Sequence, residues 1–339
     1  MRNGYVLGFI ALLLIGCSSS TDSPFIPSAS SVWVVNSLGE TLSKVNLDPD
    51  SVVVNAQLLG SAPNDIAVFK DRAYIVNSLS NNVQIINLTT EQTIGTIEIY
   101  LGLNPYNIVV ENEQRAFVSN WLTGNVSVLD LTAAVETDTI TTDGVPQGLC
   151  IAAGRLFVSD INLDLVQFTY GPGRLLAYDL ATLGFADTVT VGVNPQVVLP
   201  GPDGNLHVVC TGEIGADAGQ VMILDPQTLS IIVTIQIGGS PGSLAFNSND
   251  VAYLGSVAWA GEGWILTYDA LTHQILRGTS DPILLPSSAM DVVCARNDHI
   301  FVACFNDDAL IELDEADSLV HSYTVGDGPV AAAIYPGDE

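Results

Sequence analysis

Basic residues are scarce in this sequence. The 339 residues include 9 Lys and Arg against 37 Asp and Glu, which gives a formal net charge of −28 at pH 7. A surface of this sign repels phosphate backbones and anionic lipid headgroups, so we expect no nucleic-acid partner and no direct adsorption to a membrane. The acidic excess either attracts cations or keeps the protein soluble, and we favour the second interpretation.

Long hydrophobic runs are also missing. The apolar run at residues 5–15 follows Arg2 and is too short to cross a bilayer as a helix. It ends in Leu14-Ile15-Gly16-Cys17, which resembles the lipobox of bacterial lipoproteins. The resemblance implies that residues 1–16 are a signal peptide and that Cys17 is lipidated. The alternative is an ordinary secretory signal with a chance cysteine.

The residue after Cys17 is Ser18 rather than the Asp of inner-membrane retention, so the resemblance implies an outer-membrane lipoprotein of the cell envelope, facing the periplasm or the outside. Lipid would then be the only membrane attachment. Residues 17–31 form the lipidated cysteine and a flexible Ser- and Pro-rich tether, which spans roughly 20 Å.

Cysteine is sparse, with five in the whole chain. Beyond Cys17, we expect the remaining four to be buried thiols that fill apolar space: Cys150, Cys210, Cys294 and Cys304. Equivalent positions in a repeat are too far apart for a disulfide. Cys294 and Cys304 share a hairpin, and a turn at residues 297–298 would place Cys294 opposite Phe301, with Cys304 on the other face.

A repeat with a period of roughly 40–50 residues fills the rest of the chain. Seven short apolar runs end at steps of 41, 43, 40, 50, 46 and 48 residues, on Asn36, Asn77, Asn120, Asp160, Cys210, Ser256 and Cys304. Each unit has four short strands in meander order, which we name A to D from the centre outward. This predicts an all-β, seven-bladed β-propeller of four-stranded antiparallel blades over residues 32–339.

The two ends of the repeat are out of phase. The first unit begins at strand B with Val32, and the chain ends on an unpaired strand A at residues 330–335. We therefore expect residues 330–335 to join the strands at residues 32–59 and close the ring, which removes the exposed strand edges.

Two segments resemble the YVTN repeat. They read AYIVNSLSNNVQIINLTT at residues 73–90 and AFVSNWLTGNVSVLDLTA at residues 116–133. The family implies a seven-bladed propeller of bacterial envelopes or archaeal surface layers that acts as a binding or scaffold module. Propellers of this shape also include quinone-dependent dehydrogenases and lactonases, so the fold alone does not define an activity.

One face of the ring carries the D–A and B–C loops. Its inner circle is expected to hold Asn64, Tyr106, Gln147, Gln196, Gly242, Asp291 and Val330, and its second circle the seven strand-B ends. Amides, a phenol and carboxylates at a channel mouth suit a polar ligand that is uncharged or cationic. Alternatively, the Asn and Asp of the second circle only cap turns.

Three adjacent B–C loops are enlarged, at residues 160–174, 210–220 and 255–264. Their aromatic residues either stack on a ligand or pack the loops together: Phe168, Tyr170, Trp259 and Trp264. The candidate ligand face is Tyr106, Asn120, Trp121, Asp160, Trp259 and Asp291.

Signals for catalysis are weak, and no catalytic, cofactor-binding or metal-ligating residue is assigned. No histidine lies on the loop face or has metal-ligand spacing. Asp160, Asn162 and Asp164 have the spacing of a calcium loop but lack its Gly and Glu, so Ca²⁺ is at most a weak expectation.

We expect a monomeric module that binds a protein partner or a small polar ligand. The alternative is a metal-dependent hydrolase or lactonase that uses Asn120, Asp160 and Asp291, and a third interpretation is a purely structural spacer.

Overall fold

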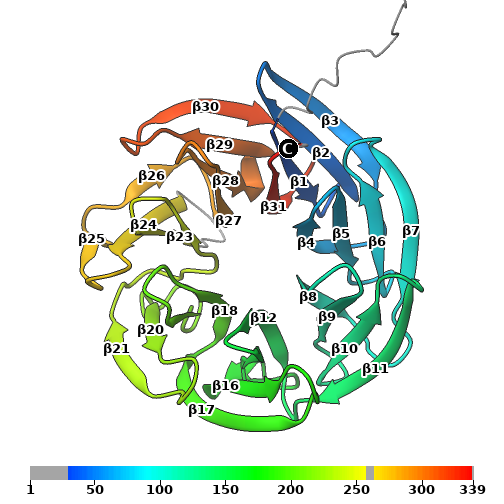
Figure 1. Ribbon diagram of the computed structural model, residues 1–339. Helices are drawn as coiled ribbons and strands as arrows, with labels where there is room; N and C mark the ends of the chain where they lie inside the picture. The colour runs from blue at the N-terminus through cyan, green and yellow to red at the C-terminus, as the bar shows by residue number, and fades with distance from the viewer. Residues whose placement is uncertain (1–29, 257–262, 338–339) are drawn as a thin grey trace, which may run out of the picture.

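The computed structural model describes residues 30–256 and 263–337. They form seven sheets arranged as a ring around a central axis (Figure 1). The expected signal peptide, Cys17 and most of the tether lie outside the described residues, as does Trp259. Within the described ranges, no helix has the length and hydrophobicity that crossing a membrane would require.

Each blade contains four strands in meander order. Blade 1 consists of β31 (Pro329–Tyr335), β1 (Ser31–Asn36), β2 (Thr41–Leu47) and β3 (Asp50–Leu58). Blade 2 contains β4 (Pro63–Phe69), β5 (Arg72–Asn77), β6 (Asn82–Asn87) and β7 (Gln92–Glu98). Blade 3 contains β8 (Pro105–Val110), β9 (Arg115–Asn120), β10 (Asn125–Asp130) and β11 (Val135–Thr141). Blade 4 contains β12 (Pro146–Ala152), β13 (Arg155–Asp160), β16 (Pro172–Asp179) and β17 (Phe185–Val193).

Blades 5 to 7 repeat this order. Blade 5 contains β18 (Pro195–Pro200), β19 (Leu206–Cys210), β20 (Gln220–Leu224) and β21 (Ile231–Ile235). Blade 6 contains β22 (Ala245–Phe246), β23 (Val251–Ser256), β24 (Gly263–Asp269) and β25 (Ile275–Arg277), and a short fifth strand, β26 (Ile283–Leu285), also pairs with β24. Blade 7 contains β27 (Ala289–Cys294), β28 (Ile300–Cys304), β29 (Ala309–Leu313) and β30 (Leu319–Thr324). A hairpin of β14 (Leu163–Asp164) and β15 (Thr169–Tyr170) and a 3₁₀ turn, η1 (Phe305–Asp307), lie in loops.

The apolar cores lie between the blades rather than at the centre of the ring. Seven clusters of buried side chains correspond to the seven blade interfaces. Strand B is therefore apolar on both faces, as in β5, where every residue after Arg72 is buried, while the outermost strand β7 is mostly exposed. This explains why the B strands read as continuous apolar runs.

The predicted closure of the ring is confirmed. β31 pairs antiparallel with β1, with Val32 opposite Ile334 and Val34 opposite Ala332. Successive β1 side chains point to opposite faces. Trp33 and Val35 pack into the core shared with blade 2, whereas Val32 and Val34 pack into the core shared with blade 7. The strand β1, which pairs with the C-terminal strand β31, thus contributes side chains to two of the seven cores.

The cysteine prediction holds in part. Cys150, Cys210 and Cys304 are buried free thiols, while Cys294 is only partly buried. The expected register of their hairpin is wrong by one residue, because Cys294 lies opposite Ile300 and Val293 lies opposite Phe301. Cys294 and Cys304 therefore pack on the same face, against one core, rather than on opposite faces.

Removal of residues 326–339 tests the closure. It deletes β31, exposes the inner edge of β1 and uncovers apolar side chains in two blade interfaces, so we expect loss of cooperative thermal unfolding and aggregation. Deletion of residues 336–339, which follow the strand, is the control and should leave both unchanged. A monomeric 326–339 deletion with the parental melting temperature would contradict the closure.

Candidate functional site

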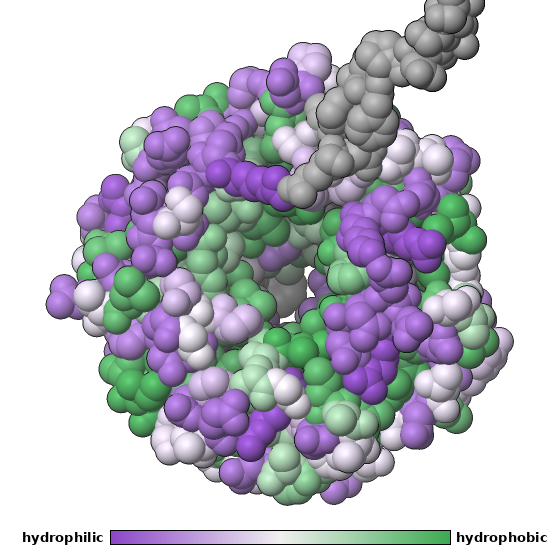
Figure 2. Space-filling view, in the orientation of Figure 1, coloured by the Kyte–Doolittle hydropathy of each residue, from purple (hydrophilic) through white to green (hydrophobic). Residues whose placement is uncertain are grey.

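The centre of the ring contains a cavity of about 310 Å³. Figure 2 shows the opening in the middle of the molecule. Its wall is formed by the starts of all seven A strands, and it includes every residue of the predicted inner circle: Asn64, Tyr106, Gln147, Gln196, Gly242, Asp291 and Val330. The lining also contains Asp65, Asn107 and Met290, and it contains no Lys, Arg or His.

A repeated bulge directs these residues toward the channel. In six blades a proline pairs with the last residue of strand B, as Pro63 does with Asn77, and the ladder then shifts register. The residue after the proline is left outside the pairing, as Asn64 is in blade 2. Proline is tolerated here because a strand's first residue need not donate to the ladder.

Blade 7 corrects one predicted position. Ala289 takes the place of the proline and pairs with Cys304, so Met290 is the bulged residue. Asp291 is one residue further along and corresponds to Asp65 of blade 2. It still lines the cavity, but as a member of a different set of side chains.

That set connects neighbouring A strands. Asp65 Oδ2 accepts hydrogen bonds from Ile108 N at 2.9 Å and Asn107 Nδ2 at 2.6 Å. Asn107 Oδ1 accepts from Leu149 N at 2.9 Å, and Asp291 Oδ2 accepts from Ala332 N at 2.8 Å. Each side chain thus satisfies a backbone amide of the next A strand, which is the edge strand of its sheet.

The two cavity carboxyls are difficult to ionise. Burial raises the pKa of Asp65 to about 6, although its hydrogen bonds oppose the shift. Burial raises the pKa of Asp291 to about 7, and the charge of Asp65 contributes to this rise. The two residues come from β4 and β27, the A strands on either side of β31. Without a basic neighbour in the lining, this part of the cavity favours cations or uncharged polar groups.

Tyr106 and Trp121 stack on each other at the mouth of the cavity. Their ring centroids are 4.7 Å apart and the ring planes differ by 13°. Burial raises the pKa of Tyr106 to about 12, with smaller contributions from Asp65 and Tyr170. The Trp121 Nε1 atom is buried and has no hydrogen-bond partner among the described residues. Two residues of the predicted ligand face therefore form one aromatic unit beside the cavity.

The predicted second circle is buried instead of lining the mouth. All seven strand-B ends have at most 5% of their surface exposed. Asn120 Nδ2 donates to Asn125 Oδ1 at 2.9 Å and to Ser127 Oγ at 2.8 Å, inside its own blade. A Cβ on Gly102 would overlap the Asn120 side chain, so the preceding loop packs directly on it. This geometry favours the turn-capping interpretation for Asn120.

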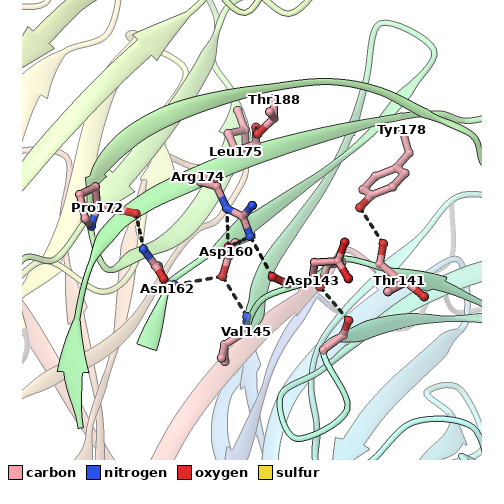
Figure 3. Close-up of polar contacts among 12 residues, drawn as sticks. Thr141, Asp143, Val145, Asp160, Asn162, Pro172, Arg174, Leu175, Tyr178 and Thr188 are labelled. Carbon is pink, nitrogen blue, oxygen red and sulfur yellow. Dashed lines mark hydrogen bonds and ion pairs between the residues drawn. The ribbon is translucent and has the colours of Figure 1, made fainter. Parts of the chain in front are cut away.

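Asp160 occupies the same position in blade 4 and is held by Arg174 (Figure 3). Arg174 Nε donates to Asp160 Oδ2 at 2.8 Å, while Asp160 Oδ1 accepts from Val145 N at 2.9 Å and Asn162 N at 3.0 Å. The Asp160 side chain is 1% exposed and that of Arg174 is 37% exposed. Asp160 therefore stabilises the base of the enlarged loop.

The spacing that resembled a calcium loop serves local turns. Asn162 Nδ2 donates to Pro172 O at 2.8 Å, and Asp164 Oδ1 accepts from Val166 N and Gln167 N. The proposed hydrolase set is not assembled either. Asn120 and Asp160 are fully buried within their own blades, and only Asp291 of the three lines the cavity.

The aromatic residues of the enlarged loops have separate surroundings. Phe168 is 74% exposed. Trp264 is partly buried against the core between blades 5 and 6. Tyr170 contributes to the raised pKa of Tyr106, so this part of the blade 4 loop lies on the Tyr106 side of the ring, although Tyr170 does not line the cavity.

The sequence alone did not indicate one cluster of side chains of the types that bind metal ions. Asp203, His207 and His273 bring one ligand atom each within 4.8 Å of one another. The expectation that no histidine has metal-ligand spacing concerned spacing along the chain, and the fold adds His273 from the neighbouring blade. The four-residue spacing of Asp203 and His207 was the available local signal.

Comparisons with known proteins identify the fold. The structure matches hydrazine synthase from Kuenenia stuttgartiensis with a TM-score of 0.68 at 14% identity, over 90% of this chain and 100% of that chain. It matches a putative 6-phosphogluconolactonase from Bacteroides fragilis with a TM-score of 0.69 at 14% identity, over 94% and 99%. No protein-family model and no curated protein matches the sequence. Identities this low show a shared propeller fold alone.

Replacement of Arg174 tests the role assigned to Asp160. Arg174→Asn leaves a buried carboxylate without its counter-charge. Because Arg174 is 37% exposed and Asp160 keeps its backbone hydrogen bonds, this should cost about 1.5–3 kcal/mol in the free energy of unfolding measured in urea. The double variant Asp160→Asn/Arg174→Asn reproduces the Asn120–Asn125 pair of blade 3. It should recover most of the loss, and equal destabilisation of the single and double variants would contradict the assignment.

The raised pKa of Asp291 predicts a pH-dependent stability. Between the ordinary Asp pKa of 3.8 and about 7, the folded state binds more protons than the unfolded state, so this group lowers stability as pH rises. Asp291→Asn keeps an acceptor oxygen, as Asn107 has, and should be more stable than the parent at pH 8 by on the order of 1–2 kcal/mol. The difference should vanish near pH 3.5. Asp138→Asn on the exposed strand β11 controls for loss of one charge and should show no such pH dependence.

Proposed function

We propose that this protein is a YVTN-type propeller that acts as a binding module of the cell envelope and takes a small, polar, cationic ligand at the mouth of its central channel. The observation that carries the proposal is the convergence of side-chain amides, the Tyr106 phenol and two carboxylates around one cavity without a basic residue. Sites for small ligands combine apolar walls with a small number of placed polar groups, and here the polar groups stand beside apolar residues such as Leu199, Leu244 and Met290.

The carboxylates favour a cation over a neutral ligand. Asp65 and Asp291 are protonated more readily than ordinary aspartates, and a cation bound between them would stabilise their ionised forms. The stacked Tyr106 and Trp121 provide an aromatic surface next to these charges, which adds cation–π attraction for an amine or guanidinium. The long loop of blade 4 makes one side of the mouth different from the others, so the ligand need not have sevenfold symmetry.

The attachment to the envelope rests on the sequence at residues 14–17. Lipid on Cys17 would tether the ring through residues 18–30, which precede β1. β1 begins beside the end of β31, where Ser31 pairs with Tyr335, and this is the side opposite the D–A and B–C loops. The channel mouth would therefore face away from the anchored side.

Ligand binding is tested with three cations, spermidine, choline and arginine methyl ester, with glucose as the neutral probe and citrate as the anionic one. At pH 8 we expect saturable calorimetric binding of a cationic probe at one site per chain, weakened at least tenfold in Asp65→Asn/Asp291→Asn. The control Glu98→Gln/Asp138→Asn removes the same two charges from exposed strand positions.

Equal weakening in the channel variant and the surface control would show that the net charge of −28 attracts cations without a site, and would contradict the proposal. The anchor is tested separately by cell fractionation. Cys17→Ala should move the protein from the membrane fraction to the soluble envelope fraction, and its retention in the membrane would contradict lipidation at Cys17.

A further inference from the structure

A second polar cluster lies on the face opposite the channel mouth. Asp203 is in the turn between β18 and β19 of blade 5, His207 is in β19, and His273 is in the turn between β24 and β25 of blade 6. His207 Nε2 is 3.0 Å from Asp203 Oδ1, and His273 Nε2 is 3.1 Å from Asp203 Oδ2. Two imidazoles from adjacent blades thus converge on one carboxylate.

The cluster is close to the surface but shielded from it. The side chain of His207 is fully buried, that of Asp203 is 10% exposed and that of His273 is 18% exposed. An ion therefore has access past Asp203 and His273, and the protein excludes most water from the ligand atoms. Partial burial of this kind strengthens ion–ligand attraction relative to an exposed acidic patch.

The His207 ring is held in one orientation. Its Nδ1 lies 2.6 Å from the Tyr268 hydroxyl oxygen. The ring lies edge-to-face against Phe246 at 5.1 Å and stacks on Tyr268 at 5.8 Å between centroids. A histidine whose second nitrogen is held by a polar partner is the usual arrangement of metal-ligating histidines, because that partner fixes the tautomer and direction of the first nitrogen.

The carboxylate is oriented in the same way. Asn205 N donates to Asp203 Oδ1 at 3.0 Å, and Asn205 Nδ2 donates to Asp203 Oδ2 at 2.7 Å. Each carboxylate oxygen retains a lone pair for the imidazole side of the cluster.

Gly201 leaves room beside the buried nitrogen. A Cβ at this residue would overlap His207 Nε2 and would lie 2.9 Å from Asp203 Oδ1. A side chain at this position would therefore occupy the space next to two of the three candidate ligand atoms.

We propose that Asp203, His207 and His273 bind a divalent first-row transition-metal ion, with Zn²⁺ as the representative, and that the ion links blades 5 and 6. Two neutral imidazoles and one carboxylate are a common three-ligand zinc set, which leaves a fourth position for water. Ligand atoms at ~2.1 Å from a tetrahedral ion are about 3.4 Å apart. The two imidazole–carboxylate distances, 3.0 Å to Oδ1 and 3.1 Å to Oδ2, are close to this value. The three ligand atoms taken together lie within 4.8 Å of one another, so side-chain rotation must bring the widest pair closer when the ion binds.

Binding requires a change of tautomer. In the metal-free form each neutral imidazole that donates to Asp203 carries its single proton on Nε2, and His207 Nδ1 then accepts from the Tyr268 hydroxyl. When Nε2 coordinates the ion, this proton is lost from Nε2 to solvent and one is taken up at Nδ1, so that the Nδ1–H of His207 donates to the Tyr268 hydroxyl oxygen. A neutral imidazole therefore releases no net proton, and a charged one releases one.

The other two histidines provide an internal comparison. His299 Nδ1 lies 2.5 Å from Glu312 Oε1, but His321 Nδ1 is 3.6 Å from Glu312 Oε2 and its side chain is 52% exposed. Glu312 Oε2 also accepts a hydrogen bond from the Tyr323 hydroxyl at 2.7 Å. In the described part of the chain, only the Asp203 group brings three ligand atoms within 4.8 Å, so His321 is a suitable control position.

The test uses the full chain after removal of metal with a chelator. Calorimetric titration with ZnCl₂ should show one high-affinity ion per chain in the micromolar range or tighter, and Co²⁺ should give the visible absorption of a low-symmetry N/O site. MgCl₂ and CaCl₂ should give no saturable binding, because these ions prefer all-oxygen sites.

Two variants separate a metal site from a hydrogen-bonded cluster. His273→Gln lies on a partly exposed turn and should keep the parental melting temperature without metal, while it weakens Zn²⁺ binding at least tenfold and removes the Co²⁺ spectrum. His321→Gln should change neither. Failure of the parent to bind Zn²⁺ saturably below 1 mM, or equally tight binding by His273→Gln, would overturn the proposal. Binding at this face is independent of the channel, so Asp65→Asn/Asp291→Asn should leave Zn²⁺ affinity unchanged.

Discussion

The pairing of β31 with β1 is the constraint on which the rest of the structure depends. A propeller has no central core, so each blade is stable only because its two apolar faces are covered by neighbours. The side chains of Trp33 and Val35 in β1 lie in the interface with blade 2, and those of Val32 and Val34 lie in the interface with blade 7. Because β31 pairs with β1 and completes blade 1, it also stabilises both of these interfaces. The ends of the chain thereby turn an open array into a sealed ring.

The geometry of the closed ring produces the polar channel. Each A strand is the inner edge of its sheet, and Asp65, Asn107 and Asp291 accept hydrogen bonds from backbone amides of the next A strand. These side chains are needed where the blades crowd together, and their burial raises the pKa values of the two carboxyls. A structural requirement thus places charge in a cavity where it also favours a cationic ligand. The Asp203 cluster follows the same logic on the other face, since it joins two blades through side chains that share a carboxylate.

The repeat allowed the architecture to be predicted from the sequence, whereas the roles of individual polar residues could not be predicted. Strand order, closure and the inner circle follow from periodicity. In the inner circle only Asp291 is misplaced, by one residue, because blade 7 has no proline to mark the position that Ala289 occupies. The strand-B ends were correctly located, but their burial depends on loops packing over them, and Arg174 reaches Asp160 across an enlarged loop. The pairing of His207 with His273 depends on which turns of adjacent blades meet, and no local spacing encodes that contact.

Amide hydrogen exchange of β31 tests the closure most directly. In a sealed ring, the amides of β31 that donate to β1 open only with global unfolding, so they should exchange with the same free energy of opening as the amides of β1 and of β5 that are hydrogen-bonded within their sheets. Exchange of β31 many times faster than that of β1 and β5, as expected of a frayed C-terminal segment, would show that the pairing does not hold the ring together.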